Sequence, residues 1–304
     1  MNGPKVSVVI CSYNRAKRLG KAVQSVLEQE YEPFELIVVD DTSTDETPDV
    51  LARFSGDSRL RVIRRAVNSG LPSVARNEGS HAARGTYLAF LDSDDYWLPG
   101  KLRKQVEAMD AHPAWGLCHT FCRIEEPDGR QIYIRNQQDM PRDGDLYRAL
   151  LQGCFITTSS VMVRRKLFER VGGFPEDEKW RIGEDRCFFL RVAASAEIGF
   201  VPEPLAVYCK HDDNICSAAD LKQHVQFLLE NERRMIRPPF ARNAGDRRAV
   251  RGACLTLCDD ASYRLRRAGD FRASGSFAWK ACTIAPFRFA NWKKLLAAGL
   301  RKKV

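Results

Sequence analysis

Three carboxylates stand close together directly after an apolar stretch of the chain. Asp92, Asp94 and Asp95 follow residues 87–91, Tyr-Leu-Ala-Phe-Leu, which suit a buried strand. Like charges at this spacing repel one another unless a cation or hydrogen-bond donors lie among them. Mg²⁺ or Mn²⁺ would relieve the repulsion, because such an ion binds one or two carboxylates together with substrate phosphate oxygens. The cluster therefore indicates a metal-assisted site for a phosphorylated ligand.

Polar residues also follow two earlier apolar runs, residues 6–11 and 35–39. They are Ser12, Tyr13, Asn14, Asp40 and Asp41. In an open parallel sheet the ligand binds beyond the carboxyl ends of the strands, so the three polar groups should meet there. A lone Asp-rich turn is often purely structural, because Asp favours tight turns. Acidic residues at two strand ends favour a binding site instead.

A calcium loop of the EF-hand type would also bring several Asp residues together. Such a loop needs Gly at its sixth position and Glu at its twelfth. Both residues are missing from the segment that starts at Asp92, so we exclude this reading.

Strands alternate with helices through the first hundred residues, which predicts an α/β domain with a mostly parallel sheet. The predicted strands cover residues 6–11, 35–39, 60–64 and 87–91. Predicted helices follow these strands, among them residues 72–84 and 98–111.

The middle of the chain predicts shorter strands, at residues 116–121, 159–163, 198–201 and 205–209. The polar interval 125–145 is expected to form loops, and a helix is expected over residues 184–196. From about residue 218 onward the pattern is helical. Its segments are 221–235, 247–267, 271–284 and a final amphipathic stretch, 290–303.

Four blocks of the sequence, in this order, resemble the family 2 glycosyltransferases with the GT-A fold. They are VSVVICSYNR, ELIVVDDTSTDET, NSGLPSVARNEGSHAARGTYLAFLDSDDYWLPGKL and GEDRCFFLRV. The resemblance covers about residues 4–215 and implies a Rossmann-like, mostly parallel sheet flanked by helices. We therefore expect a GT-A domain over residues 1–215 and a basic helical region over residues 216–304.

The resemblance also implies a site for a nucleotide-sugar donor. Its aspartate pair after the second strand implies contacts to the base and ribose, with Asp41 favoured for the base. Its DxD-type motif and ARN segment imply further donor contacts. The expected donor-binding residues are Ser12, Tyr13, Asn14, Asp40, Asp41, Arg76, Asn77, Asp92, Ser93 and Asp94. The expected ligands of a divalent metal, Mg²⁺ or Mn²⁺, are Asp94, Asp95 and His211.

The block Gly-Glu-Asp at residues 183–185 resembles the family motif that supplies the general base. Acidic residues are also ordinary at a helix N-terminus, because they offset the helix dipole. The resemblance implies that Asp185, with Glu184 beside it, accepts a proton from the acceptor hydroxyl in an inverting displacement. Trp180, four residues before Glu184, is the aromatic candidate for contact with the acceptor.

These observations predict an inverting, metal-dependent transferase that moves a sugar from a nucleotide donor, expected to be UDP-linked, to a hydroxyl acceptor. Synthesis of a cell-envelope polysaccharide or glycolipid would suit it. The alternative is a protein of the same fold that binds nucleotide sugars without catalysis. Binding to nucleic acid is not expected, because no recognition-helix or aromatic–basic RNA motif accompanies the basic residues.

The positive charge of the chain is concentrated at one end. Residues 216–304 hold 19 Lys/Arg and 7 Asp/Glu, whereas residues 1–215 hold 29 and 32. Either a solvated basic surface or contact with an anionic membrane would explain this, and residues 290–303 suit an interfacial helix. We find no secretory signal and no metal-ligand pattern among the ten cysteines, so we expect a cytoplasmic protein, at most peripheral on the inner face of the membrane.

Overall fold

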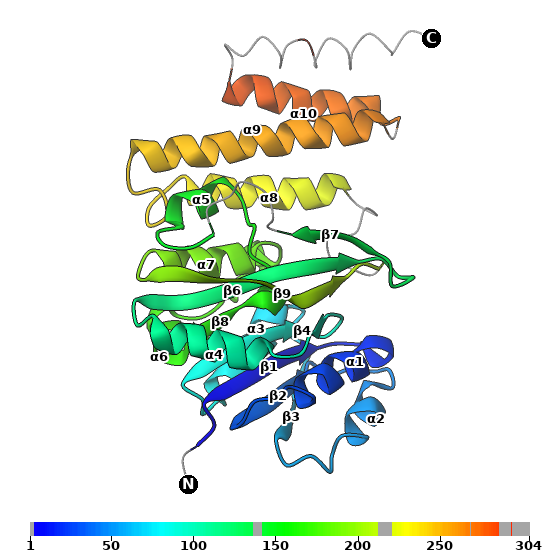
Figure 1. Ribbon diagram of the computed structural model, residues 1–304. Helices are drawn as coiled ribbons and strands as arrows, with labels where there is room; N and C mark the ends of the chain where they lie inside the picture. Colours follow the sequence, from blue (N-terminus) through cyan, green and yellow to red (C-terminus); the bar gives the residue numbers. More distant parts are fainter. Residues whose placement is uncertain (1–2, 136–141, 212–220, 268, 286–292, 294–304) are drawn as a thin grey trace. The chain divides into compact units, whose positions relative to one another are not determined.

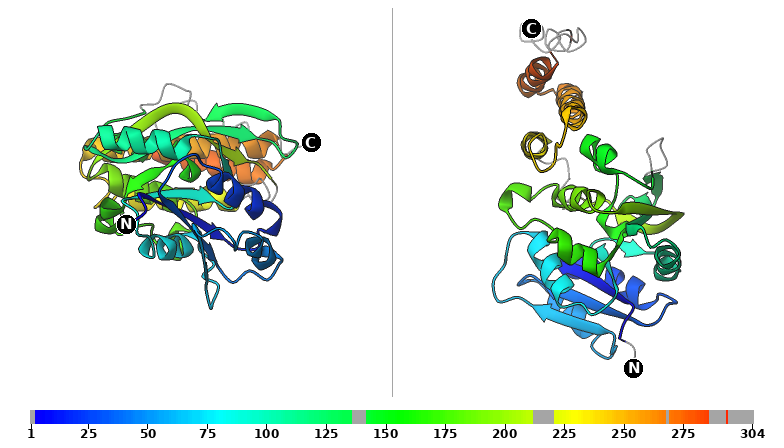
Figure 2. Two further views of the ribbon diagram at one scale, coloured as in Figure 1. Left: turned by 60° about the horizontal axis from the view of Figure 1, so that its bottom comes forward. Right: turned by 90° about the vertical axis from the view of Figure 1, so that its left-hand side faces the viewer.

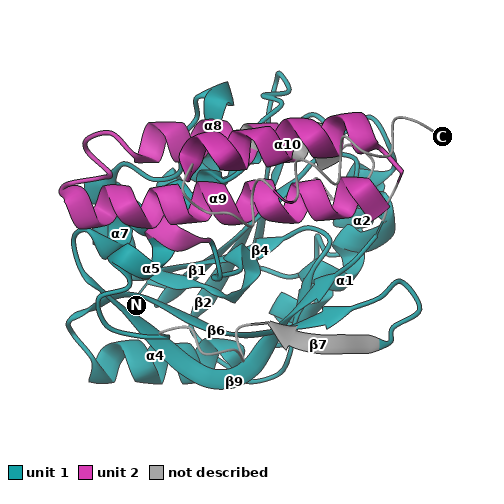
Figure 3. Cartoon of the chain, turned by 90° about the horizontal axis from the view of Figure 1, so that it is seen from above, with its two compact units in different colours: residues 1–150, 154–211 teal, residues 151–153, 212–304 magenta. Residues whose placement is uncertain are grey.

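The computed structural model of the chain describes residues 3–135, 142–211, 221–267, 269–285 and 293 (Figure 1). It forms two compact units (Figure 3). Unit 1 consists of residues 1–150 and 154–211, and unit 2 consists of residues 151–153 and 212–304. The expected boundary between residues 215 and 216 lies outside the described residues.

One sheet runs through unit 1. Within the described ranges it has nine strands, in the order β3-β2-β1-β4-β8-β6-β9-β5, with β7 paired to β6. The strands are β1 (Val6–Ser12), β2 (Phe34–Asp40), β3 (Leu60–Arg64), β4 (Tyr87–Asp92), β5 (Tyr96–Trp97), β6 (Trp115–Glu125), β7 (Gln131–Arg135), β8 (Met162–Arg164) and β9 (Glu197–Cys209). The first four strands pair with one another in parallel, and β8 pairs with β4 in the antiparallel direction.

Helices connect many of the strands of unit 1. In unit 1 they are α1 (Ala16–Leu27), α2 (Thr47–Ala52), α3 (Pro72–His81), α4 (Lys101–Ala111), α6 (Arg165–Val171) and α7 (Glu184–Ala193). Unit 1 also contains two single 3-10 turns, Thr158–Ser160 and Glu178–Trp180. Helix α5 (Tyr147–Gln152) has its first four residues in unit 1 and its last two in unit 2.

The predicted α/β architecture is confirmed, and each of the first four predicted strands is present. Three predictions for the middle of the chain are wrong. The strand predicted at residues 159–163 is replaced by a 3-10 turn, Thr158–Ser160, and a shorter strand, β8, that begins at Met162. The interval 125–145 contains strand β7, which pairs with β6 through the main chain and so needs no apolar pattern of its own. The segments 198–201 and 205–209 form one strand, β9, because the backbone passes Pro202 and Pro204 without ending the pairing to β6.

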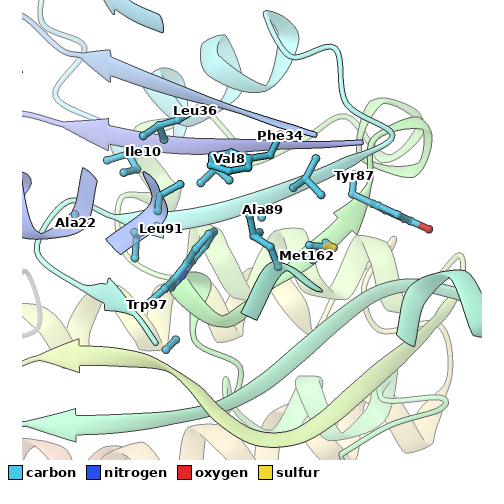
Figure 4. Packing of buried hydrophobic residues seen from close by; sticks show 14 of the residues in the cluster. Val8, Ile10, Ala22, Phe34, Leu36, Tyr87, Ala89, Leu91, Trp97 and Met162 are labelled. Carbon is cyan, nitrogen blue, oxygen red and sulfur yellow. The ribbon is translucent and has the colours of Figure 1, made fainter. Parts of the chain in front are cut away.

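The two faces of the sheet are buried against different helices, as the period of two along a strand requires. Residues of one face, such as Val8, Ile10 and Leu36, pack with α1 and α4 in a core that includes Trp97 (Figure 4). On the other face Phe90 meets Phe174 and two further rings of α6 and α7, with centroids 5.1 to 6.4 Å apart.

Gly79 lets α3 lie directly on this second face. A Cβ at that position would come within 2.6 Å of a Val9 methyl group and 3.0 Å of a Val39 methyl group. Such contacts are too close for any larger residue, so the glycine fixes the distance between α3 and strands β1 and β2. Helix α3 carries Arg76 and Asn77, and its position decides where they lie.

Unit 2 is helical. It contains α8 (Leu221–Met235), α9 (Ala244–Arg267) and α10 (Phe271–Ile284), and α9 packs against both of the others (Figures 2 and 3). Buried residues from all three helices, including Leu229, Cys258 and Phe277, form a separate core. The predicted helices 221–235, 247–267 and 271–284 are confirmed, whereas the predicted segment 290–303 lies outside the described residues apart from residue 293. Among the described helices none is both long and apolar enough to cross a bilayer.

Candidate active site

Arg76 joins two acidic segments that lie far apart in the sequence. Its guanidinium donates to Asp92 Oδ1 at 2.9 Å and to Glu184 Oε1 at 3.4 Å, and it lies 4.7 Å from the centroid of the Phe174 ring. The side chain is 5% exposed. Burial alone would lower its pKa, but the surrounding carboxylates outweigh this and raise it, so Arg76 stays charged. The end of β4 and the start of α7 therefore share one cation.

Asp95 is turned into the protein. Ser159 Oγ donates to its Oδ2 at 2.5 Å, and the Cys209 N–H donates to its Oδ1 at 3.0 Å. The Asp92 N–H in turn donates to Ser159 Oγ at 3.2 Å. Burial, together with the charges of Asp94 and Asp92, raises the pKa of Asp95 well above its ordinary value, although these hydrogen bonds act in the opposite direction.

Asp94 faces the imidazole of His211, which lies two residues beyond the end of β9. His211 Nε2 lies 2.9 Å from Asp94 Oδ2, and Arg15 Nε lies 3.7 Å from the same oxygen. The predicted metal ligands Asp94 and His211 are thus brought together, while Asp95 has both oxygens occupied inside the protein. Within the part of the chain that is described, no three His, Cys, Asp or Glu side chains gather closely enough to hold a metal ion.

This donor set can still suit Mg²⁺ or Mn²⁺. Such ions usually take one or two protein carboxylates and complete their coordination with water and substrate phosphates. Burial and the neighbouring Asp94 also raise the pKa of Asp92, with Arg76 opposing them. A concentration of negative charge at this strand end is the electrostatic condition that favours a cation.

The predicted donor residues at the end of β2 are held firmly. Asp41 accepts hydrogen bonds from Arg65 Nη1 at 2.5 Å, from the Ser69 hydroxyl at 2.7 Å and from the Ser69 N–H at 3.1 Å. Asp40 accepts from the Ser43 N–H at 3.1 Å, and Arg64 Nε lies 3.6 Å from its other oxygen. Both aspartates are buried. Their predicted contacts to a nucleotide stay predictions.

The loop after β1 shows a different pattern. The Ser12 hydroxyl is buried and has no hydrogen-bond partner among the described residues, whereas Tyr13 is 48% exposed. Asn14 has a positive φ of 51°, which Asn tolerates better than most residues, and its side chain accepts from the Thr44 N–H at 2.8 Å. In the loop after β2, Thr42 has a φ of 67°, which is a costly conformation for a β-branched residue. Such strained backbone is most often found at functional sites.

The two candidate bases lie in the first turn of α7, directly after Gly183, which has a φ of 87°. Glu184 has 14% of its side chain exposed. Burial and the neighbouring Asp185 raise its pKa to about 7, against the opposing effect of Arg76. Asp185 accepts from the Arg186 N–H at 2.6 Å, and the Cys154 thiol lies 3.9 Å from its other oxygen. A carboxylate pair with one raised pKa is typical of acid–base sites.

Three other candidates are buried in this structure. Asn77 uses its whole amide on the segment after α6: it donates to Phe174 O and Glu176 Oε1, both at 2.8 Å, and accepts from the Phe174 N–H. Ser93 and Trp180 are buried. Their predicted contacts to donor and acceptor stay predictions.

Ser159, Arg15 and Arg65 contact the candidate aspartates but were not anticipated. Ser159 stands in the sequence Thr-Thr-Ser-Ser, which carries no chemical signal of its own. Arg15 and Arg65 follow strand ends, where a basic residue near predicted phosphate contacts could have been noticed. Long-range partners of this kind emerge only when the strand order is known.

Comparison with known proteins identifies the family to which this chain belongs. The sequence model of Glycosyl transferase family 2 matches residues 7–172. An uncharacterized glycosyltransferase of Nostoc is 36% identical over 217 residues, which cover 69% of this chain and 66% of the relative. TuaG of Bacillus subtilis, a glycosyltransferase named for teichuronic acid biosynthesis, is 47% identical over 166 residues, 54% of this chain and 63% of TuaG. A rickettsial glycosyltransferase matches over only 33% of its own length, so the matches span part of these relatives.

Solved structures share the fold at low sequence identity. TarS of S. aureus in complex with UDP-GlcNAc superposes with a TM-score of 0.66 at 18% identity, covering 97% of this chain and 89% of TarS. The mannosyltransferase PcManGT of Pyrobaculum calidifontis, in complex with GDP-Man and Mn²⁺, gives a TM-score of 0.59 at 21% identity, covering 99% and 87%.

Proposed function

Because this chain belongs to glycosyl transferase family 2, we propose that it transfers a sugar from a nucleotide-sugar donor to a hydroxyl group, with inversion at the anomeric carbon. One observation carries the proposal: Arg76 holds Asp92 and Glu184, so the predicted donor motif and the predicted base motif lie on either side of one guanidinium. Two chemical requirements, donor binding and proton removal, would thereby be met at one end of the sheet.

The donor would bind along the ends of β1, β2 and β4. Asp41 would accept from the base and Asp40 from the ribose, with Ser12 offering its unpaired hydroxyl. UDP is the nucleotide we favour; TarS, a structural neighbour, binds UDP-GlcNAc, whereas PcManGT binds GDP-Man.

A divalent ion, Mg²⁺ or Mn²⁺, would be held by Asp94 and His211, with Asp95 orienting the turn that carries Asp94. When bound, the ion would neutralise negative charge on the departing diphosphate. Arg76 contributes a fixed positive charge to the same region. Its ion pairs with Asp92 and Glu184 offset the repulsion between these two carboxylates.

Asp185 would act as the general base. It is partly exposed, and its Oδ1 is oriented by the Arg186 N–H. As the acceptor oxygen attacks the anomeric carbon, the proton passes to Asp185 and the bond to the nucleoside diphosphate breaks. Glu184 has the pKa of a group that shares its proton near neutral pH, and it would tune the charge next to Asp185.

The likeness to TuaG supports an acceptor in a cell-envelope polysaccharide. A screen of nucleotide sugars for Mn²⁺-dependent donor hydrolysis tests the core of the proposal without knowledge of the acceptor. Release of a nucleoside diphosphate from one or two donors is the expected result. Binding of donor without hydrolysis, and without transfer to any supplied glycan, would favour the non-catalytic alternative.

A further inference from the structure

The helical unit 2 contains a cavity of its own. It lies among α8, α9 and α10 and has a volume of about 410 Å³. Its lining residues are Leu229, Glu232, Arg233, Ile236, Arg251, Cys254, Cys258, Lys280, Thr283 and Ile284. The volume is within the range of cavities that enclose small organic ligands. The residues of the candidate active site all belong to unit 1, so this cavity is a separate feature.

One part of the lining is apolar. Leu229 comes from α8, Ile236 follows the end of α8 directly, and Ile284 lies at the end of α10. The Cys258 thiol adds to this surface; burial raises its pKa to about 11, so it is uncharged near neutral pH. Aliphatic side chains and neutral thiols gain from covering a hydrocarbon chain.

The other part of the lining is cationic. Arg233, Arg251 and Lys280 come from three different helices, and Glu232 is the one carboxylate among the lining residues. Arg233 pairs with Glu230 at 2.8 Å. Arg251 and Lys280 form no ion pair within the described ranges of the chain; Lys280 Nζ lies 4.9 Å from the centroid of the Phe277 ring. Two cations at the cavity are therefore available to an anion.

We propose that this cavity binds an amphiphilic anion, the phosphate ester of a long hydrocarbon chain, with the phosphate between Arg251 and Lys280 and the chain against Leu229, Ile236 and Ile284. A neutral lipid would leave the cations unused, and a free phosphate would leave the apolar surface in water. Charge and apolar surface together match a single-chain lipid phosphate. This inference does not depend on the proposed transferase activity.

Calorimetry on the full chain without nucleotide sugar tests the proposal with three probes below their micelle concentrations. They share one chain and differ in the head: dodecyl phosphate, dodecanol and dodecyltrimethylammonium. Inorganic phosphate serves as the probe without a chain. We expect saturable binding of dodecyl phosphate and binding about tenfold weaker, or none, for the other three.

The double variant Arg251→Gln, Lys280→Gln should bind dodecyl phosphate about tenfold more weakly. Arg247→Gln, Arg272→Gln is the matched control, because it removes one exposed cation each from α9 and α10 outside the cavity lining. Circular dichroism melting should show that both variants fold. Equal loss of affinity in both double variants would mean that only general charge attraction is at work. Equal binding of dodecanol would show that the cations play no role. Equal binding of inorganic phosphate would show that the hydrocarbon chain plays no role. Each of these outcomes overturns the proposal.

Discussion

Asp185 is the residue for which the consequences of substitution differ most sharply between binding and catalysis. Its carboxylate accepts from the Arg186 N–H and lies near the Cys154 thiol. Among the described contacts it has none with the donor-side aspartates Asp41 and Asp94. A side chain placed in this way can be changed without removing a described contact to Asp41 or Asp94. It is therefore the residue at which the transferase proposal can be separated from simple nucleotide-sugar binding.

Asp185→Asn should abolish proton removal and leave donor affinity nearly unchanged, because the amide has the same shape but cannot act as a base. Loss of a general base costs about a hundred- to ten-thousand-fold in rate. Calorimetry with the donor and Mn²⁺ and a transfer assay on the same preparation measure both effects. Glu178→Gln, at an exposed carboxylate of the preceding 3-10 turn, is the control. Comparable turnover in Asp185→Asn would assign the base elsewhere.

Glu184 makes the stability of unit 1 depend on pH in a direction opposite to that of an ordinary ion-paired carboxylate. Its ordinary value is 4.5, and its pKa in the folded protein is about 7. Between these two values the folded chain holds a proton that the unfolded chain has lost, so the free energy of unfolding falls as pH rises through this window. Glu184→Gln cannot lose this proton.

Glu184→Gln should therefore gain stability relative to the natural chain as pH rises from about 5 to 8, by at most about 3 kcal/mol. Urea unfolding of both proteins at the two pH values measures the difference. Glu178→Gln should show no such change with pH. A constant difference between Glu184→Gln and the natural chain would mean that Glu184 is already ionised at the lower pH.

At the scale of elements, Ser159 joins the 3-10 turn before β8 to the acidic end of β4. Its hydroxyl donates to Asp95 and accepts from the Asp92 N–H, and its carbonyl accepts from Trp97 Nε1 at 2.7 Å. The turn thus holds the loop after β4 from two sides. The geometry of Asp94, which lies between Asp92 and Asp95, depends on this connection.

Ser159→Ala should weaken Mn²⁺-dependent donor binding, because Asp95 loses a hydrogen bond and can turn toward Asp94. The same change should destabilise the protein by about 1–3 kcal/mol, the cost of a buried polar group left unpaired. Ser160→Ala is a matched control: Ser160 is equally buried, but its hydroxyl donates to Thr157 O within the turn. If the two variants lose donor affinity equally, Ser159 acts only through general stability.

The strands β1, β2 and β4 could be predicted because each contains an apolar run between turn signals, and β3, Leu-Arg-Val-Ile-Arg, shows a weaker signal of the same kind. The register of the later strands could not be predicted in this way. Strand β9 passes two prolines and is held by its partner β6, and β7 lies in a polar interval. Asp92 was found by its residue type and its place after an apolar strand, whereas Glu184 was found through the resemblance of its motif to the family. Ser159 was missed because its role comes from a contact across 64 residues with Asp95, which only the folded chain creates.

At the scale of the whole molecule, the two ends of the chain differ in charge. The 19 Lys/Arg and 7 Asp/Glu of residues 216–304 contrast with the near balance of the preceding residues. Several of these cations lie on described helices, where Arg264 and Arg233 have acidic partners on their own helix. Residues 286–304 contain six Lys/Arg and no Asp/Glu. Their charge is therefore not balanced within the segment itself.

We expect the full chain to bind vesicles that contain anionic lipid, and a version ending at Ala285 to bind them more weakly. Each Lys or Arg near such a surface adds about 1 kcal/mol at low salt, and the attraction falls as salt screens it. Flotation with phosphatidylglycerol vesicles at low and high salt, with phosphatidylcholine vesicles as the neutral control, measures this. Arg251→Gln, Lys280→Gln in the full chain separates the cavity of unit 2 from the terminal cations, because only a lipid seated in the cavity would make flotation sensitive to those two positions. Equal flotation of the full chain and the shortened version would show that residues 286–304 do not attach the protein to a membrane.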